Sequence, residues 1–479
     1  MDWSAVWPEI IMAGAGTVLV AADPFARSRA AQLVCVWLAM AACVAAGVAA
    51  LLLPRQGDVV LRGMVVLDGL TLYFRLLFLA AALLVVLFSL DFISARGKDL
   101  VEFVALILFA TTGAMVLAAS ADVVSLWVGL ELLSVSSYIL AAFLRDEPRG
   151  HEAGLKYLLN GALASSILLF GISLLYGLTG QTSLSGIAAG LPGAVAAAYG
   201  GVVWLALGLC LAGLAFKIAA APFHLWAPDA YEGAPTPVTG YLMVVAETAG
   251  FAAILRLVST AMAPLSPEWR LWLAVLAAVT MTVGNVTALW QKNLKRMLAY
   301  SSVAQVGYIL AGVAAASPSG VGGTLFYLLA YLFTTLGAFA VVVALSARAR
   351  GEMISDYAGL GRRAPVLAAL LTFFLASYVG IPGSAGFMGK LGLIGAAVDG
   401  HLAWVAVAIA VNSAVSVGYY WSVARTMWID PAPPESGPIV ASGPTGLSLA
   451  VSAAGCLCLG VLPQIFFAVS GWAGAGVGR

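Results

Sequence analysis

Residues 211–241 read LAGLAFKIAAAPFHLWAPDAYEGAPTPVTGY, and this stretch decides the fold. It begins as an apolar helix, carries Lys217 inside the apolar run and reaches Pro222 five residues later. A proline within a helix cannot donate to the carbonyl four residues back, here that of Ile218, and its ring clashes with that group. The stretch therefore predicts a membrane helix broken at Pro222, with a lysine beside a freed backbone acceptor.

His224 follows Lys217 by seven residues, which is about two helical turns and places both on one face. Ionisable groups at membrane depth are costly, and they commonly mark an ion or proton path. Two interpretations of His224 stay open, a proton relay and a hydrogen-bonded packing histidine.

Composition places the whole chain in the membrane. Of its 479 residues, 62% are hydrophobic and 9% are charged, whereas soluble proteins carry about 25% charged residues. The net charge is +1 and no basic stripe with interleaved aromatic residues is present, which argues against nucleic acid as a partner. The five cysteines form no CxxC pair, and there is no Walker A loop, so we expect no metal, iron–sulfur cofactor or ATP-driven step in this chain.

Apolar runs of about 20 residues recur along the chain, each long enough to cross the hydrocarbon layer. We predict an all-α polytopic membrane protein with fourteen spans, at about 4–22, 31–53, 70–92, 100–119, 122–143, 155–178, 200–221 (continuing as a broken helix to about 232), 236–257, 271–290, 298–316, 321–346, 365–397, 402–428 and 444–470. Most Lys and Arg residues of the loops follow odd-numbered spans, and the exceptions are Arg55, Arg62, Arg256 and Arg270. The positive-inside rule then puts both termini outside the cytoplasm.

A weak internal repeat organises the single membrane domain. Span 7 carries Lys217 and breaks at Pro222, and span 12 carries Lys390 and breaks near residues 380–383. The two spans lie five apart, so two successive five-helix units must be inverted relative to each other, as in transporters with a site near the midplane. We predict three N-terminal spans (1–99), a first unit (100–257), a second unit (271–428) and a C-terminal span (444–479).

Glu131 lies near the centre of span 5, where a lone charge costs about 2.5–3.5 kcal/mol on insertion scales. A functional acid, a structural ion pair and a permanently protonated acid are the three interpretations. Lys156 opens span 6 and either extends to water or pairs with Glu131.

Three further groups are placed too deep to reach the surface easily. Glu247 and Lys390 lie in the middle of their spans, and Lys217 lies deep if span 7 continues past its break. Burial disfavours the charged form of a lysine, so these lysines can exchange a proton near neutral pH. Arg75 in span 3 more simply pairs with a lipid headgroup or another helix, and Gln305 takes the place in the second unit that Glu131 holds in the first.

Four stretches together resemble one family: LWVGLELLSVSSYIL (126–140), GLAFKIAAAPFHLWAPDAYEGAPTPVTGY (213–241), QKNLKRMLAYSSVAQVGYIL (291–310) and GIPGSAGFMGKLGLI (380–394). They are similar to the antiporter-like membrane subunits of respiratory complex I, the NADH:quinone oxidoreductase of bacteria. The wider family includes multisubunit cation/proton antiporters.

The resemblance implies a share in redox-driven proton pumping in the bacterial cytoplasmic membrane, with lipid, protons and the other membrane and peripheral subunits as partners. NADH, FMN, iron–sulfur clusters and quinone are then expected in those partner subunits. Glu131, Lys156, Lys217 and Lys390 match positions of the family's proton-transfer chain, to which the residues themselves add His224. Glu247 departs from the pattern, because the family usually has lysine there.

We therefore expect a signal from the quinone site to alter a Glu131–Lys156 pair, after which a proton moves from Lys217 through Glu247 toward Lys390. Two alternatives remain: a cation/proton antiporter subunit without a redox partner, and a structural subunit that spaces the membrane arm.

Overall fold

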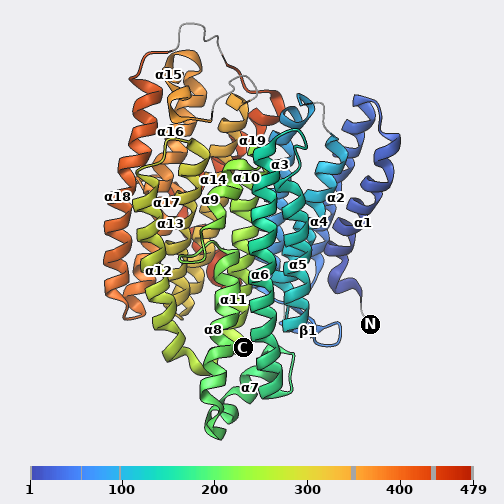
Figure 1. Cartoon of the computed structure of the whole chain (residues 1–479), viewed down its shortest axis with the longest axis vertical. Helices are drawn as coiled ribbons and strands as arrows, with labels where there is room; N and C mark the ends of the chain where they lie inside the picture. Colours follow the sequence, from blue (N-terminus) through green and yellow to red (C-terminus); the bar gives the residue numbers. More distant parts are fainter. Residues whose placement is uncertain (1–2, 55–56, 97–98, 347–351, 433–438, 476–479) are drawn as a thin grey trace.

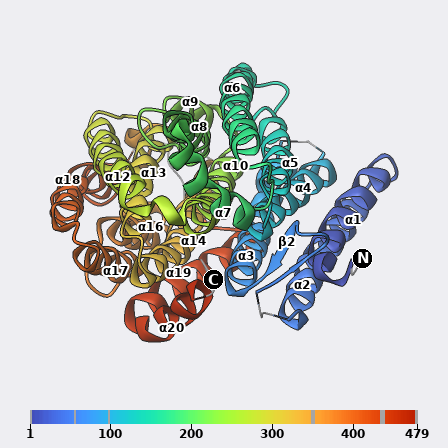
Figure 2. The same ribbon diagram turned by 90° about the horizontal axis from the view of Figure 1, so that it is seen from below.

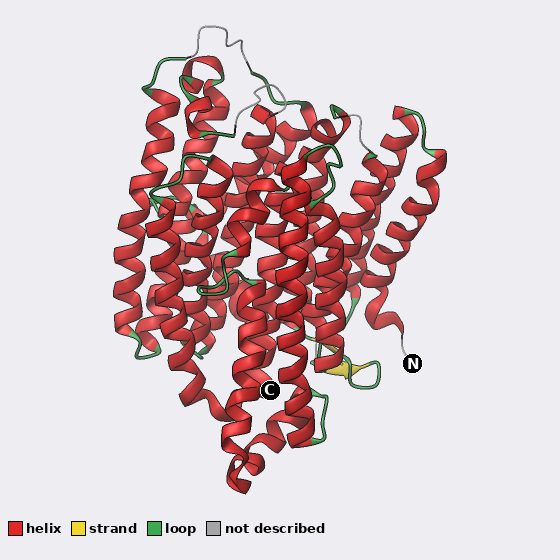
Figure 3. Ribbon diagram, in the orientation of Figure 1, coloured by secondary structure: helices red, strands yellow, loops and turns green. Residues whose placement is uncertain are grey.

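The computed structural model describes residues 3–54, 57–96, 99–346, 352–432 and 439–475. It is a bundle of helices that run along one common direction, as Figure 1 and Figure 3 show. The helices are α1 (Trp7–Ala22), α2 (Arg29–Leu52), α3 (Gly69–Ser94), α4 (Leu100–Ala119), α5 (Val123–Ala141), α6 (Pro148–Thr179), α7 (Leu184–Ala194), α8 (Gly200–Lys217), α9 (Trp226–Gly233), α10 (Thr236–Tyr241), α11 (Glu247–Arg256), α12 (Ser266–Ala288), α13 (Leu294–Ala314), α14 (Pro318–Ser346), α15 (Leu360–Arg363), α16 (Pro365–Val379), α17 (Ala385–Asp399), α18 (Ala403–Trp428), α19 (Gly443–Val461) and α20 (Pro463–Gly474).

The predicted number of crossings agrees with the bundle. Within the described residues, thirteen helical segments are long and apolar enough to span a membrane; two of them are Trp3–Phe25, which contains α1, and Thr236–Ala261, which contains α10 and α11. Helices α16 and α17 together form a fourteenth, broken crossing. A short antiparallel hairpin, β1 (Asp58–Val60) with β2 (Val65–Leu67), is the one departure from an all-helical chain in the described part. Both marked ends of the chain lie toward the same end of the bundle (Figure 1), as an even number of crossings requires.

The break in span 7 lies earlier than the sequence predicts. Helix α8 ends at Lys217, because Ala219 adopts a left-handed conformation with φ of 54°. The amide of Ala220 donates to the carbonyl of Ala215 at 2.8 Å, which closes the helix as a Schellman motif does. The expectation that Pro222 frees the carbonyl of Ile218 inside a helix is therefore wrong.

The second half of span 7 is the short helix α9, which ends at Gly233 close to the predicted limit. Because residues 218–225 between the two halves are not helical, Lys217 and His224 do not share a helical face. The prediction that Lys217 and His224 lie on one helical face is therefore wrong, because α8 ends at Lys217.

The break in span 12 falls where the sequence predicts it. Gly380 ends α16 with φ of 91°, and α17 begins at Ala385. The amide of Gly386 donates to the hydroxyl of Ser377 at 3.1 Å, so the start of α17 is held against the end of α16. A Cβ atom at Gly386 would lie 1.8 Å from the carbonyl oxygen of Ser377, so this junction has no room for a side chain.

Helices α1 and α2 form one edge of the bundle, with the hairpin and α3 on their inner side, as Figure 2 shows from below. Two buried ion pairs fix this edge. Arg75 of α3 binds Glu9 of α1 through two hydrogen bonds of 2.8 and 3.0 Å, which confirms that Arg75 pairs with another helix. Arg256 of α11 binds Asp68 at the start of α3, one of its hydrogen bonds measuring 2.8 Å.

Candidate proton-transfer site

Lys217 is buried at the last position of α8, with 2% of its surface exposed. Its ammonium donates to the hydroxyl of Ser134 on α5 at 2.9 Å and lies 5.8 Å from the ring centroid of Tyr157. The interpretation in which this lysine extends to the membrane surface does not fit this geometry. No carboxylate lies within ion-pair distance of it among the described residues.

Glu131 is only partly buried on α5 and accepts a hydrogen bond from the hydroxyl of Ser165 on α6. The indole of Trp127 donates to that same hydroxyl at 3.1 Å, so Trp127, Ser165 and Glu131 form a short chain of hydrogen bonds. The structure contains no ion pair between Glu131 and Lys156 in its described part, and the predicted partnership is wrong for this conformation.

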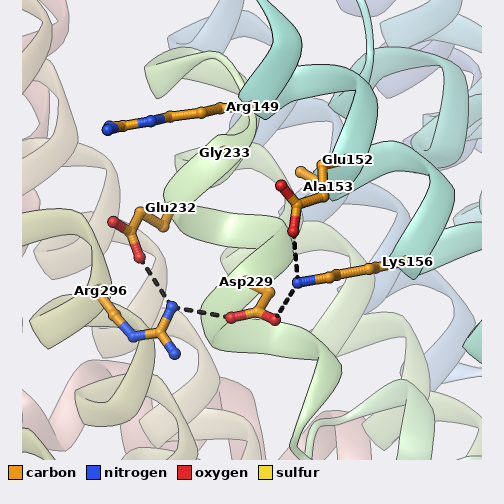
Figure 4. Close-up of a pocket in the computed structure, with 8 residues that line it drawn as sticks. All are labelled: Arg149, Glu152, Ala153, Lys156, Asp229, Glu232, Gly233 and Arg296. Carbon is orange, nitrogen blue, oxygen red and sulfur yellow. Dashed lines mark hydrogen bonds and ion pairs between the residues drawn. The ribbon is translucent and has the colours of Figure 1, made fainter.

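Lys156 instead belongs to a cluster of charges, shown in Figure 4. Its ammonium binds Asp229 of α9 at 2.8 Å and Glu152, one helical turn earlier, at 2.8 Å. Arg296 of α13 binds Asp229 and Glu232, each at 2.8 Å. Lys156 pairs with Asp229 because α9, the second half of the broken span, packs against α6. We call these five residues the charged cluster; they line a pocket of about 260 Å³.

Glu247 opens α11 with 1% of its surface exposed. Its carboxylate accepts hydrogen bonds from the hydroxyls of Tyr231 at 2.9 Å, Tyr331 at 3.1 Å and Ser302. Three helices, α9, α13 and α14, thus supply donors to one acid. Among the described residues no lysine, arginine or histidine lies within ion-pair distance of this carboxylate.

Lys390 lies in α17 just beyond the break of span 12, with 5% of its surface exposed. Its ammonium donates to the carbonyl oxygens of Tyr378 at 2.9 Å and Val379 at 3.0 Å, the last residues of α16. It also lies 4.4 Å from the ring centroid of Tyr308. A lysine beside carbonyls freed by a helix break, which the sequence predicts for span 7, is thus found in span 12.

His224 does not join these groups. It is 7% exposed, its ring packs at 6.4 Å from that of Tyr300, and its Nδ1 has no hydrogen-bond partner in the described chain. Both interpretations of His224, a proton relay and a hydrogen-bonded packing histidine, stay predictions.

Further polar side chains lie on α13 and the helices beside it, where Ser302 binds Glu247 and the ring of Tyr308 lies near Lys390; of these, the sequence singles out Gln305. Ser301, next to Ser302 on α13, hydrogen-bonds the hydroxyl of Tyr420, and Gln305 bonds both Tyr420 and Tyr327. The ring of Tyr420 stacks at 5.6 Å on that of Tyr378, whose carbonyl holds Lys390. The signal was present in the segment YSSVAQVGY (300–308), where hydroxyl groups recur inside an apolar helix. We call Ser301, Ser302, Gln305, Tyr327, Tyr378 and Tyr420 the hydroxyl network; Ser302 binds Glu247, and the backbone carbonyl of Tyr378 binds Lys390.

Five of the buried ionisable side chains in the described part of the chain differ in the partners they have. Arg75 and Arg256 are each paired with a carboxylate. Lys217, Glu247 and Lys390 have only neutral hydrogen-bond partners. An unpaired buried charge costs several kcal/mol, and a lysine or glutamate avoids this cost by becoming neutral, whereas arginine cannot. The three unpaired groups are thus suited to gain and lose protons.

Comparison with known proteins places this architecture in one family. The model of the family described as NADH:quinone oxidoreductase/Mrp antiporter, TM matches residues 120–416. NADH-quinone oxidoreductase subunit N of Trichlorobacter lovleyi is 42% identical over 97% of this chain and 95% of its own length.

Two solved structures resemble the whole bundle. A chain of respiratory complex I from Thermus thermophilus matches with a TM-score of 0.77 and 33% identity, over 96% of this chain and 98% of that one. A chain of the Mrp complex from Dietzia sp. matches with a TM-score of 0.86 and 23% identity, over 100% of this chain and 98% of that one, which shows a shared fold.

Proposed function

Because this chain belongs to the family of NADH-quinone oxidoreductase subunit N, we propose that it translocates protons as a membrane subunit of such an enzyme. The length of the chain and its overall pattern indicate the same subunit within the wider family. Electron transfer from NADH to quinone then takes place in partner subunits that hold the flavin and the iron–sulfur clusters. The chain works in the bacterial cytoplasmic membrane with both termini on the periplasmic side.

One observation carries the proposal: Lys217, Glu247 and Lys390 are all buried, and each is held by neutral groups alone. Two of them adjoin helix breaks, where backbone groups are released from helical bonding. A subunit that only spaced the membrane arm would have no need for such groups, because apolar residues of equal volume would pack at lower cost. The three buried groups therefore count against the alternative that this chain is only a structural subunit that spaces the membrane arm.

The proposed route begins at Lys217. Its aliphatic stem packs against Gly250 of α11, where an added Cβ atom would lie 3.4 Å from Cγ of the lysine. Glu247 lies about one helical turn before Gly250, so the lysine and the acid flank the same segment. From Glu247 the proton passes along the hydroxyl network to Lys390, with water bridging the longer steps. The broken helices in spans 7 and 12 support two inverted units. Glu247 is then the last proton carrier of the first unit, and Lys390 receives the proton in the second unit.

The test is replacement of Lys217 in the assembled enzyme. We expect Lys217→Ala to lower the number of protons pumped per NADH oxidised in proteoliposomes, because no other ammonium group stands at the end of α8. Lys292→Ala is the matched control, since Lys292 is exposed in a loop. An unchanged proton-to-electron ratio in Lys217→Ala, with a normally assembled complex, would overturn the proposal.

A second function is favoured by the likeness to a chain of the Mrp complex, namely cation/proton antiport without a redox partner. Composition of the native complex decides between the two. Extraction in mild detergent with flavin and iron–sulfur subunits supports the redox-linked pump, and extraction without them supports antiport.

A further inference from the structure

A second cavity is lined by residues at the end of α15, at the beginnings of α16 and α19, and just before α19. Its volume is about 560 Å³, and apolar side chains form most of its wall. Leu367 and Leu370 of α16 face Leu449 of α19 across it. Val366 and Val440 at its rim are 70% and 71% exposed, so the cavity is an open apolar groove.

One charged residue lines this groove. Arg363 is the last residue of α15 and directly precedes Ala364 and α16. The Nε atom of Arg363 is buried and has no hydrogen-bond partner in the described chain. No carboxylate among the described residues lies within ion-pair distance of its guanidinium. Since buried polar groups nearly always find a partner, this donor calls for an acceptor that a bound molecule would supply.

The surrounding backbone favours a negative charge at the same place. Helix α16 begins at Pro365 and α19 at Gly443, and the two helices pack against each other. The first turn of a helix carries a partial positive charge of about half an elementary unit, which attracts anions. The backbone amide of Ile439 donates to the carbonyl of Arg363 at 3.5 Å, so residues 439–441 line one side of the groove.

We propose that this groove binds an anionic phospholipid, with its phosphate at Arg363 and an acyl chain along Leu367, Leu370 and Leu449. The position at the ends of membrane helices sets the phosphate at headgroup level and the chain within the hydrocarbon layer. Basic pockets between membrane helices are suited to such headgroups. A soluble anion would leave the apolar wall uncovered, and a quinone or a lipid without net charge would leave the positive charge of Arg363 without a counter-charge.

The probe is phosphatidylglycerol with a photoreactive group on one acyl chain, added to the assembled complex in detergent. We expect crosslinked peptides from residues 364–370 and 439–450. Arg363→Gln should reduce this labelling about fivefold, the effect of one basic side chain at an anionic membrane surface. Arg362→Gln is the matched control, because Arg362 is exposed and does not line the groove.

Further measurements separate the sources of the anion. Ala450→Phe, which fills the groove but keeps Arg363, should also abolish labelling, whereas loss of labelling with excess inorganic phosphate would point to a free-anion site. Equal labelling by photoreactive phosphatidylcholine, or unchanged labelling in Arg363→Gln, would overturn the proposal. So would protection of the groove by a neighbouring subunit in the native complex.

Discussion

Lys156 and Asp229 are joined by an ion pair of 2.8 Å that ties α6 to the second half of the broken span 7. Asp229 also binds Arg296 of α13, so one carboxylate connects the first and second predicted units. The pair thus takes the place of the Glu131–Lys156 contact predicted from the sequence, and Asp229 binds a cation of each predicted unit, Lys156 and Arg296.

We expect Asp229→Asn to impair coupling while leaving the fold intact. The side chains of Lys156 and Asp229 are 44% and 33% exposed, and water screens a pair this exposed, so its loss should change stability little. NADH oxidation and proton uptake should become less tightly linked in proteoliposomes, with normal amounts of assembled complex. Glu152→Gln serves as control, because it removes the other carboxylate bound to Lys156 and leaves Arg296 untouched.

Glu247→Gln should block proton transfer, because the amide keeps the size of the side chain but cannot carry a proton. Glu247→Lys should retain part of the activity, since the hydroxyls of Tyr231, Ser302 and Tyr331 can rotate to accept from an ammonium. The proton-to-electron ratio of the two variants is the measurement. Equal ratios in Glu247→Gln and the unmodified enzyme would remove Glu247 from the route.

Glu9→Gln should destabilise the subunit by about 3–5 kcal/mol, because it leaves Arg75 charged and unpaired in the interior. The double variant Glu9→Leu with Arg75→Met should recover most of this loss, as apolar replacements of buried pairs do. Heat inactivation of the assembled complex measures both. If the single variant proved as stable as the unmodified protein, the pair would not hold α1 in place.

Gly386→Ala should disrupt the junction between α16 and α17, because the new Cβ atom would meet the carbonyl of Ser377 at 1.8 Å. Overpacking of this kind costs about 1–3 kcal/mol or more, and it would displace the carbonyls that hold Lys390. Gly395→Ala in the same helix is the control, since nothing lies within 4 Å of its added Cβ atom. Reduced thermal stability together with reduced pumping is expected in Gly386→Ala alone.

Much of the fold was predictable, because a membrane allows few solutions. A chain of apolar runs must form helices, and the glycine and proline at 380–383 can only interrupt one. The position of the break in span 7 was not predictable, since it depends on Ala219 rather than on Pro222. Alanine rarely adopts a left-handed conformation, so nothing in the sequence marks Ala219 as the end of a helix. Proline is a known helix breaker, and the prediction therefore placed the break at Pro222, three residues later.

The depth of single ionisable residues was predictable, and the structure confirms that Lys217, Glu247 and Lys390 are buried. The hydrogen-bond and ion-pair partners of these residues were not predictable. They depend on how each helix is rotated about its axis and shifted along its neighbour, which the local sequence does not specify. The sequence predicts Glu131 as the partner of Lys156, yet its partner on another helix is Asp229. That carboxylate stands in APDAYEG (227–233), a segment whose path depends on the break before it.

Both marked ends of the chain point to one end of the bundle. An affinity tag or fluorophore fused before Trp3 and another fused after Gly474 would therefore be exposed to the same compartment. A membrane-impermeant reagent applied to sealed vesicles should modify both labels or neither, whichever way the protein is inserted.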